Sequence, residues 1–358
     1  MKKLVLATAM VAGLSLHGAA NAFEYNVVTF GMSGQSLSSA TGLNDFGQAT
    51  VNLQIGGGPS AYIGSASGLT PIGTPEGSHT AAAGIGNQGH VVGDLDGRAF
   101  LWQNGSLTDL GTPGNSYATS VNDAGAVAGQ YSTGSGERAF LWSNGSMTDL
   151  GTLGGRDSTA QDINNASQVA GFSYTGSAFH GFLWTAGTMQ DLGSLDGGDS
   201  YAYGLNDAGQ VVGFSYVGAS SANHAFFWTT ETGMVDIGTL GGRGSFAMSV
   251  NNNGQIVGTS TTAATEYGQH AFVWTAAEGM VDLNDLIDPA SGWTIVGAEN
   301  INEVGQILAI GYSPTGSYEA VLLSPVPEPA TYAFMLSGLG LVGLAKARRR
   351  HIKSATNI

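Results

Sequence analysis

The chain has 358 residues, of which 10% are charged and none is cysteine. The lack of cysteine excludes disulfide scaffolds, thiolate metal sites and thiol nucleophiles. The formal net charge of −15 is concentrated in residues 23–325, where 4 basic and 25 acidic residues give about −21. Such a surface repels nucleic acid and anionic lipid and can attract cations. With 57 glycines and 42% hydrophobic residues, the composition favours a folded domain rich in strands and turns.

Residues 1–22 have the pattern of a secretory signal peptide. Lys2 and Lys3 precede an apolar stretch at residues 4–16, which Ala20-Asn21-Ala22 follows as a cleavage site of small residues. The alternative interpretation is a buried helix. We expect a signal helix that is removed after Ala22, so that the mature chain begins at Phe23.

One turn segment recurs along the middle of the chain. Its usual form is apolar-Asn-(Asn/Asp)-X-Gly, although the second copy is degenerate and two others differ at one position. The seven copies begin at Leu43, Ile85, Val121, Ile163, Leu205, Val250 and Ile301. A short apolar stretch follows each copy, and then an aromatic segment such as Ala99-Phe100-Leu101-Trp102. The tryptophans of five such segments are spaced by 40, 42, 44 and 46 residues. A repeat of this length indicates a solenoid, a propeller or another array.

Four short strands per repeat and a period near 42 favour a propeller blade. The pairs Asn104-Gly105 and Asn144-Gly145 lie between the third and fourth strands, where a two-residue hairpin requires positive φ twice. Both pairs are followed by serine and so match the glycosylation acceptor pattern, but the hairpin explains them without glycosylation.

The two ends of the repeat region complete each other. The seventh unit stops after its third strand at Leu322-Leu323, and residues 25–30 have the pattern of an unpaired fourth strand. Pairing the two leaves no open sheet edge. We therefore predict an all-β, seven-bladed β-propeller over residues 23–325, closed by the N-terminal strand. A β-solenoid or other stacked repeat is the alternative.

The repeats closely resemble the extracellular HAF repeat, named for its His-Ala-Phe triplet. The triplet is intact at residues 224–226 and 270–272 and is His180-Gly181-Phe182 in a third copy; Asp-Leu-Gly-Thr-Leu-Gly-Gly stands at residues 149–155. The resemblance is strong over residues 80–290, although Arg98 and Arg138 replace the histidine in two copies. It implies a surface location and no particular activity.

Two sets of polar residues recur once per unit. The histidines are His180, His224 and His270, and the aspartates are Asp109, Asp149, Asp191, Asp236 and Asp282. Because equivalent positions lie on separate blades, we predict hydrogen bonding at strand ends for the histidines and turn capping for the aspartates. A three-histidine metal site, whose ligands lie about 2.1 Å from one ion, and a paired-carboxylate hydrolase are the alternatives.

No residue is predicted to be catalytic or to bind a cofactor or metal. Asp94-Leu95-Asp96-Gly97 resembles half of a calcium loop but lacks the glutamate at the twelfth position. Weak calcium binding is the one cofactor possibility that remains open.

The C-terminal segment carries a second targeting signal. An apolar run at residues 330–345 predicts a transmembrane helix, and the Lys346 to Arg350 cluster after it predicts that residues 351–358 form a short cytoplasmic tail. Pro-Glu-Pro, an apolar span and an arginine cluster, in this order over residues 326–350, closely resemble the PEP-CTERM sorting signal. The resemblance implies recognition of Pro327, Glu328 and Pro329 by an exosortase in the inner membrane, with a stop-transfer cluster of Arg348, Arg349 and Arg350. In that family the protein is then passed to the surface of bacteria that make exopolysaccharide.

These observations predict an exported protein, transiently anchored in the inner membrane, that is not an enzyme. We expect a structural or adhesive role at the cell surface or in the extracellular matrix, associated with exopolysaccharide or biofilm. The first alternative is a glycan-binding propeller lectin with exposed tryptophan or tyrosine on one face. The second is a propeller hydrolase, which needs a non-repeated acid cluster among residues such as Asp94, Asp96, Asp196 and Asp199.

Overall fold

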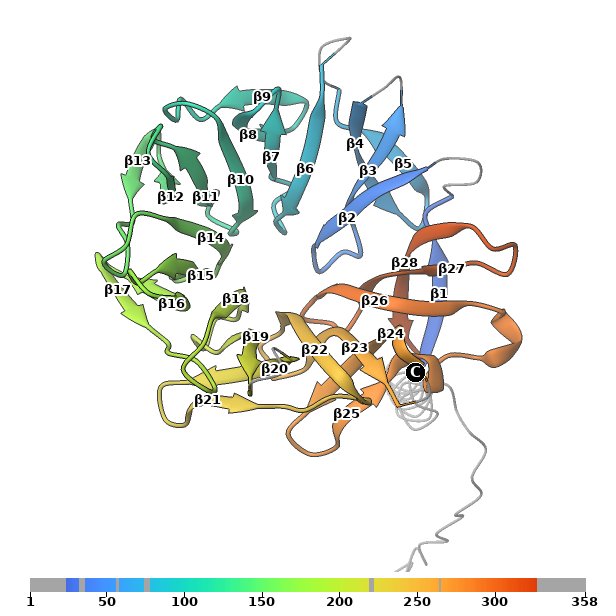
Figure 1. Cartoon of the computed structure of the whole chain (residues 1–358). Coiled ribbons are helices and arrows are strands. Elements are labelled where there is room, and N and C mark those ends of the chain that lie inside the picture. The colour runs from blue at the N-terminus through green and yellow to red at the C-terminus, as the bar shows by residue number, and fades with distance from the viewer. Residues whose placement is uncertain are drawn as a thin grey trace, which may run out of the picture.

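The computed structural model describes residues 24–31, 36–55, 58–73, 78–218, 222–263 and 265–326. The predicted signal peptide with its cleavage residue Ala22, the C-terminal helix, and the sorting residues Pro327, Glu328, Pro329, Arg348, Arg349 and Arg350 lie outside these ranges. Figure 1 shows the described strands as seven four-stranded sheets arranged in a ring. The all-β, seven-bladed propeller predicted from the repeats is confirmed.

The first six blades are antiparallel meanders of consecutive strands, with the first strand of each next to the central channel. Blade 1 holds β2 (Leu37–Leu43), β3 (Ala49–Ile55), β4 (Gly58–Ser65) and β5 (Gly68–Pro71). Blade 2 holds β6 (Thr80–Ile85), β7 (Val91–Leu95), β8 (Arg98–Gln103) and β9 (Ser106–Asp109). Blade 3 holds β10 (Ser116–Val121), β11 (Val127–Ser132), β12 (Glu137–Ser143) and β13 (Ser146–Asp149).

Blades 4 to 6 continue the pattern. Blade 4 holds β14 (Ser158–Ile163), β15 (Val169–Tyr174), β16 (Phe179–Thr185) and β17 (Thr188–Asp191). Blade 5 holds β18 (Ser200–Leu205), β19 (Val211–Val217), β20 (Ala222–Thr229) and β21 (Gly233–Asp236). Blade 6 holds β22 (Gly241–Val250), β23 (Ile256–Thr262), β24 (Thr265–Thr275) and β25 (Gly279–Asp282).

Blade 7 is built from both ends of the chain. Its strands run in the order β26 (Thr294–Ile301), β27 (Ile307–Tyr312), β28 (Tyr318–Pro325) and β1 (Tyr25–Thr29). Strand β1 pairs antiparallel with β28, with Tyr25 opposite Pro325 and Thr29 opposite Val321, and the two lie side by side in Figure 1. The predicted closure is therefore confirmed, and it removes the open edge that β28 would otherwise present.

The connection into blade 7 carries the two helices of the described residues, the short 3-10 turns Leu283–Asp285 and Pro289–Ser291. In the ranges that the structure describes, no helix has the length and apolarity required to cross a bilayer.

The core lies between neighbouring blades. The phenylalanine of each aromatic strand segment is at most 1% exposed, and these residues are Phe100, Phe140, Phe182, Phe226 and Phe272. Phe182 of blade 4 packs in one cluster with Ala128 and Ala139 of blade 3. Small residues on one blade thus accommodate a ring from the next, and each fully buried ring contributes about 1.5–3 kcal/mol.

A β-bulge shapes the channel-facing strands. In blade 5 the register of β18 against β19 shifts between Ala202 and Gly204, so that Tyr203 reaches the channel wall. Beside the bulge, a Cβ on Gly213 would lie 1.9 Å from the Tyr201 carbonyl oxygen. Side chains cannot be accommodated at that distance. The same close approach, 1.9–2.4 Å, explains the glycine at positions 93, 129, 171, 258 and 311.

Candidate functional site

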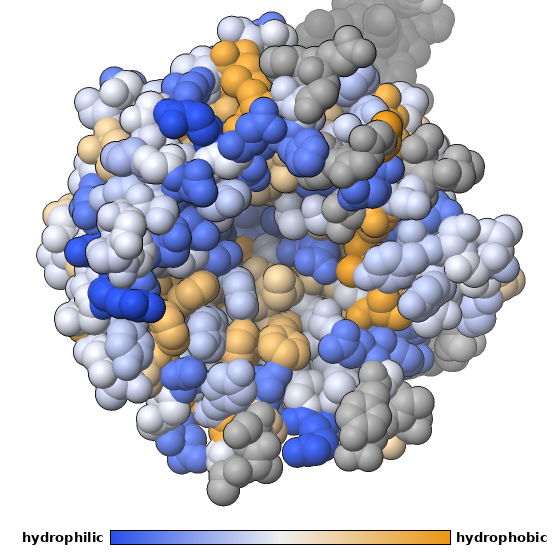
Figure 2. Space-filling model, turned by 45° about the horizontal axis from the view of Figure 1, so that its top comes forward, coloured by the Kyte–Doolittle hydropathy of each residue, from blue (hydrophilic) through white to orange (hydrophobic). Residues whose placement is uncertain are grey.

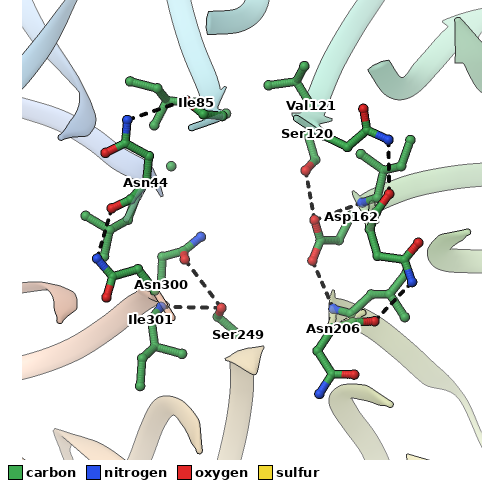
Figure 3. Close-up of a pocket in the computed structure, with 18 of the residues that line it drawn as sticks. Asn44, Ile85, Ser120, Val121, Asp162, Asn206, Ser249, Asn300 and Ile301 are labelled. Atoms are coloured by element: carbon green, nitrogen blue, oxygen red, sulfur yellow. Dashed lines mark hydrogen bonds between the residues drawn. The ribbon is translucent and has the colours of Figure 1, made fainter. Parts of the chain in front are cut away.

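The central channel is a cavity of about 430 Å³ lined by the first strand of every blade and, in all blades except blade 6, by the start of the turn that follows it. Figure 3 looks into this cavity and shows asparagines from separate blades linked by hydrogen bonds around its wall. The sequence repeat thus places one polar turn from each blade around a common axis.

The recurring asparagine holds its own turn and the next blade. Asn206 Oδ1 accepts hydrogen bonds from the backbone N–H groups of Ala208 (3.1 Å) and Gln210 (3.0 Å). Its Nδ2 donates to Gln210 Oε1 (2.7 Å) and to the carbonyl oxygen of Asn251 in blade 6 (3.0 Å). The equivalent inter-blade donors are Asn44, Asn122, Asn164, Asn251 and Asn302. Blade 2 has Gly86 at this position.

The residue after the asparagine completes a closed circle. In every blade its backbone N–H donates to the side chain of the equivalent residue in the next blade, and Glu303 donates to Asp45 to join the two ends. We call these residues the turn ring: Asp45, Asn87, Asp123, Asn165, Asp207, Asn252 and Glu303.

Acids and amides alternate around the turn ring, which separates the carboxylates. Because the ring has an odd number of members, two acids, Glu303 and Asp45, must be neighbours. The pKa of Glu303 is raised, first by burial and also by the charges of Asp45 and Asp207. The carboxylates accept hydrogen bonds from backbone or amide N–H groups, which gives them a structural role.

Asp162 is an acid on the channel wall whose position in the repeat holds no acid in the other blades. Its Oδ1 accepts hydrogen bonds from Ser120 Oγ in blade 3 and from the Ile163 N–H, both at 2.8 Å, and its Oδ2 accepts one from the Leu205 N–H in blade 5 at 2.9 Å. Figure 3 shows this carboxylate between the two neighbouring blades. Burial raises the pKa of Asp162, and the hydrogen bonds oppose the rise. The side chain therefore connects three blades.

The recurring histidines and aspartates pair within their own blades. The Nδ1 atoms of His180, His224 and His270 lie 2.9, 2.7 and 2.5 Å from the carboxylates of Asp191, Asp236 and Asp282. Arg98 makes the same contact with Asp109 at 2.8 Å, and Tyr131 Oη donates to Asp149 at 3.1 Å.

Each of these aspartates also caps the turn after it, as when the Gly193 N–H donates to Asp191 Oδ1 at 2.8 Å. The predicted strand-end and turn-capping roles agree with this geometry, and the three histidines lie on separate blades. Among the described residues, no group of three or more histidine and acidic side chains could hold a metal ion.

The other acids singled out from the sequence support loops. Asp96 and Gly97 have φ of 51° and 76° and form the hairpin turn between β7 and β8, and the Gly97 N–H donates to Asp94 Oδ2. Burial raises the pKa of Asp94. Asp196 accepts from the Gly218 N–H and Asp199 from the Phe179 N–H. The pairs Asn104-Gly105 and Asn144-Gly145 have positive φ at both residues, as the hairpin prediction requires.

Aromatic side chains form a continuous patch across blades 4, 5 and 6. Phe172 of blade 4 contacts Tyr201 of blade 5 (ring centroids 4.9 Å apart), Tyr201 stacks on Phe214 (4.9 Å), and Phe214 meets Phe246 of blade 6 (4.8 Å). Tyr174, Phe179, Tyr203 and Tyr216 extend the patch through further ring contacts. We call these eight residues the aromatic arc.

The aromatic arc lies at the end of the blades opposite the turn ring, because Tyr201 is near the start of β18 (Ser200–Leu205) and Asn206 directly follows its end. Of its eight members only Phe214 is buried; the others keep part of their surface in solvent. Figure 2 shows one face of the molecule hollowed at its centre, with apolar residues gathered on the side where Figure 1 places blades 4 to 6.

Polar atoms accompany the rings. The Tyr201 hydroxyl donates to Asp199 Oδ2 at 3.4 Å. Burial and the Asp199 charge raise the pKa of Tyr201 to about 12, so the hydroxyl keeps its proton at neutral pH. A patch that combines flat apolar faces with hydroxyl and carboxylate groups is suited to amphipathic ligands.

Sequence reasoning did not identify the aromatic arc, although a signal was present. Gly-Phe-Ser-Tyr occurs in two successive units, at residues 171–174 and 213–216, where other units have Gly93-Asp94 or Gly129-Gln130. These departures from the repeat distinguish blades 4 and 5 from the other blades.

Comparisons with known proteins identify the tail and the fold. Residues 325–350 match the PEP-CTERM protein-sorting motif, which indicates an exported protein with a membrane-anchoring C-terminal tail that is processed by exosortase. No curated protein matches the chain.

Solved structures show the propeller fold in other proteins at low sequence identity. An oligogalacturonate lyase from Vibrio parahaemolyticus has a TM-score of 0.57 at 10% identity, covering 85% of this chain and 97% of that one. The β-propeller domain of the trilobed protease from Pyrococcus furiosus has a TM-score of 0.54 at 10% identity, covering 82% and 96%. The extracellular domain of a hybrid two-component system from B. thetaiotaomicron has a TM-score of 0.52 at 10% identity, covering 84% of this chain and 39% of that one. At these identities the likeness concerns the fold alone.

Proposed function

We propose that this protein is a cell-surface or matrix propeller with an adhesive role, which holds exopolysaccharide against its aromatic arc. The aromatic arc is the observation that carries the proposal. A pyranose ring has an apolar face of C–H bonds and a rim of hydroxyl groups, so it matches aromatic faces that are accompanied by hydroxyls and a carboxylate. The sorting motif at residues 325–350 supports the export of this domain, and we propose that the exported domain meets an exopolysaccharide at the cell surface.

The likeness of the blades to the HAF repeat supports the surface location, and a signal peptide ending at Ala22 provides export. The partners in this proposal are an exosortase-type enzyme, which processes the tail, and the exopolysaccharide. The net charge of about −21 on residues 23–325 disfavours nucleic acid as a partner.

We propose further that the protein binds its ligand without turnover and without a cofactor. The acids Asp94, Asp96, Asp196 and Asp199 each accept a hydrogen bond from a backbone N–H group. The first two lie in blade 2 and the last two in the loop before blade 5. This arrangement supports a structural use of the acids over a hydrolase pair.

The blades themselves offer a matched test. Tyr117 in blade 3 and Tyr201 in blade 5 occupy equivalent positions, opposite Gln130 and Phe214 respectively, but only Tyr201 belongs to the aromatic arc. We expect Tyr201→Ala to weaken binding of a neutral glucan oligosaccharide about tenfold, or about 1.4 kcal/mol, and Tyr117→Ala to leave it unchanged.

Isothermal titration of the full chain in mild detergent, with cellohexaose and maltohexaose as probes, measures the effect. Equal losses in the two variants, or no binding by the wild-type protein, would contradict the proposal. Release of reducing ends from either probe would contradict the non-enzymatic part.

A further inference from the structure

Two aspartates occupy equivalent positions beside the blade 3–4 and blade 4–5 interfaces. They are Asp157, which precedes Ser158-Thr159, and Asp199, which precedes Ser200-Tyr201. Asp157 Oδ1 accepts from the Glu137 N–H at 3.1 Å and Asp199 Oδ1 from the Phe179 N–H at 2.9 Å. The backbone carbonyl of each aspartate accepts from a backbone N–H of the blade that it precedes, that of Tyr174 or of Tyr216. One carboxylate oxygen of each residue therefore has the same structural task.

Their second oxygens differ. Asp157 Oδ2 accepts a hydrogen bond from Arg156 Nε at 2.8 Å. In the unit after it, Gly198 replaces that arginine. Within the part of the chain that the structure describes, Asp199 Oδ2 receives one hydrogen bond, from the Tyr201 hydroxyl at the long distance of 3.4 Å. Asp199 Oδ2 thus retains acceptor capacity that the arginine takes up at Asp157.

The surroundings of Asp199 also differ. Tyr201 and Phe179 stack with centroids 5.9 Å apart, and Tyr216 contacts Phe214 at 5.8 Å, so the carboxylate lies at the edge of the aromatic arc. Asp157 is followed by Ser158-Thr159, which has no ring. A carboxylate oxygen with spare acceptor capacity beside stacked rings provides both elements that hold a sugar: a face for the ring and an acceptor for its hydroxyl groups.

Building on the proposed function, we propose that Asp199 makes the aromatic arc selective for a neutral glycan. Its Oδ2 atom accepts a hydrogen bond from a hydroxyl of the sugar that stacks on the arc. The same negative charge repels the carboxylate of a uronic acid, and this repulsion is several times stronger near a protein surface than in bulk water. The positive charge of Arg156, in the loop before blade 4, is already paired with Asp157.

The matched pair Asp199→Asn and Asp157→Asn tests this assignment in the full chain. The asparagine side chain keeps an Oδ1 acceptor for the Phe179 N–H, so the loop is retained, while its Nδ2 replaces the spare acceptor with a donor. We expect Asp199→Asn to bind cellohexaose about tenfold more weakly than the wild type and hexagalacturonate about tenfold more tightly. Asp157→Asn is expected to match the wild type with cellohexaose.

The outcomes separate this inference from the proposed function. Wild-type protein that binds cellohexaose and hexagalacturonate equally would overturn the selectivity and leave glycan binding intact. Identical behaviour of the two variants would overturn the role of Asp199. Both proposals would be overturned if the wild-type protein bound neither oligosaccharide and if adding either oligosaccharide left its thermal melting curve unchanged.

Discussion

The turn ring and the aromatic arc are made from the same repeat and follow opposite rules. At the turn ring, every blade contributes a side chain of similar size to a closed hydrogen-bonded circle. At the other end, blades 4 and 5 carry Phe172 and Phe214 where blades 2 and 3 have Asp94 and Gln130. The repeated features close the ring, and the departures from the repeat distinguish one arc of it. The comparison therefore predicts that changes at the turn ring reduce stability, whereas changes in the aromatic arc reduce binding.

The largest effect is expected at the bulge that supports the aromatic arc. Gly213→Ala would place a methyl group 1.9 Å from the Tyr201 carbonyl oxygen, so β18 and β19 must separate. We expect the free energy of unfolding to fall by about 4 kcal/mol, with loss of glycan binding.

Urea denaturation followed by tryptophan fluorescence measures this change. Gly86→Ala is the control, because a Cβ there would lie 3.5 Å from the nearest atom, the Asn122 carbonyl oxygen, at ordinary contact distance. Equal stability of the two variants would refute the steric explanation of the recurring glycine.

The next effect separates the turn ring from the aromatic arc directly. Asn206→Ala removes four hydrogen bonds at a residue that is 4% exposed, and the Asn251 carbonyl keeps the Gly254 N–H but loses its donor from blade 5. We expect a loss of about 2–3 kcal/mol in the free energy of unfolding. Binding of cellohexaose by the folded variant should stay within about twofold of the wild type. A selective loss of binding without a loss of stability would show that the two ends are not independent.

Asp162 provides a pH-dependent version of the comparison. Its folded pKa is raised by burial, so the folded state holds the proton more tightly than the unfolded state does. The contribution of Asp162 to stability is therefore greatest below its unfolded pKa of about 3.9 and falls as the pH rises toward its folded pKa.

We expect the difference in unfolding free energy between wild type and Asp162→Asn to decrease across this window, by up to about 1.4 kcal/mol for each unit of difference between the folded and unfolded pKa. Urea titrations from about pH 4 to about pH 7 measure the difference. A constant or increasing difference would contradict the assignment.

The smallest expected effect is a gain. Blade 2 has Gly86 in place of the asparagine, and the Nδ1 atom of the buried His90 beside it has no hydrogen-bond partner among the described residues. Gly86→Asn supplies acceptors for its own turn and a donor that can reach the Asn122 carbonyl. We expect a gain of about 1 kcal/mol and a rise of roughly 2 °C in the melting temperature. A lower melting temperature would show that blade 2 is built differently from its neighbours.

Much of the fold could be predicted because the relevant interactions are local or repeated. The Asn144-Gly145 turn follows from the need for positive φ at two successive residues, and the structure has 51° and 79° there. The pairing of β1 with β28 followed from one missing strand at each end of the repeat. The pairing of His180 with Asp191 was anticipated only as a strand-end hydrogen bond, since the partner depends on the register of β16 against β17.

The candidate site could not be predicted in the same way. Phe172, Tyr201 and Phe246 lie on three blades, and their contacts depend on how neighbouring sheets pack. A sequence repeat draws attention to positions that recur, whereas the aromatic arc and Asp162 are positions that do not. The two Gly-Phe-Ser-Tyr segments were the available signal, but nothing in them states that they face a common surface.

The number of blades, the turns and the identity of the closing strand all follow from the order of residues alone, because each depends on backbone conformation or on counting strands along the chain. Which side chains meet across the blade interfaces emerges only when the sheets pack into a ring. Those contacts arise from the stacking of separate sheets, and side chains such as Asp162 and Tyr201 acquire their partners from neighbouring blades.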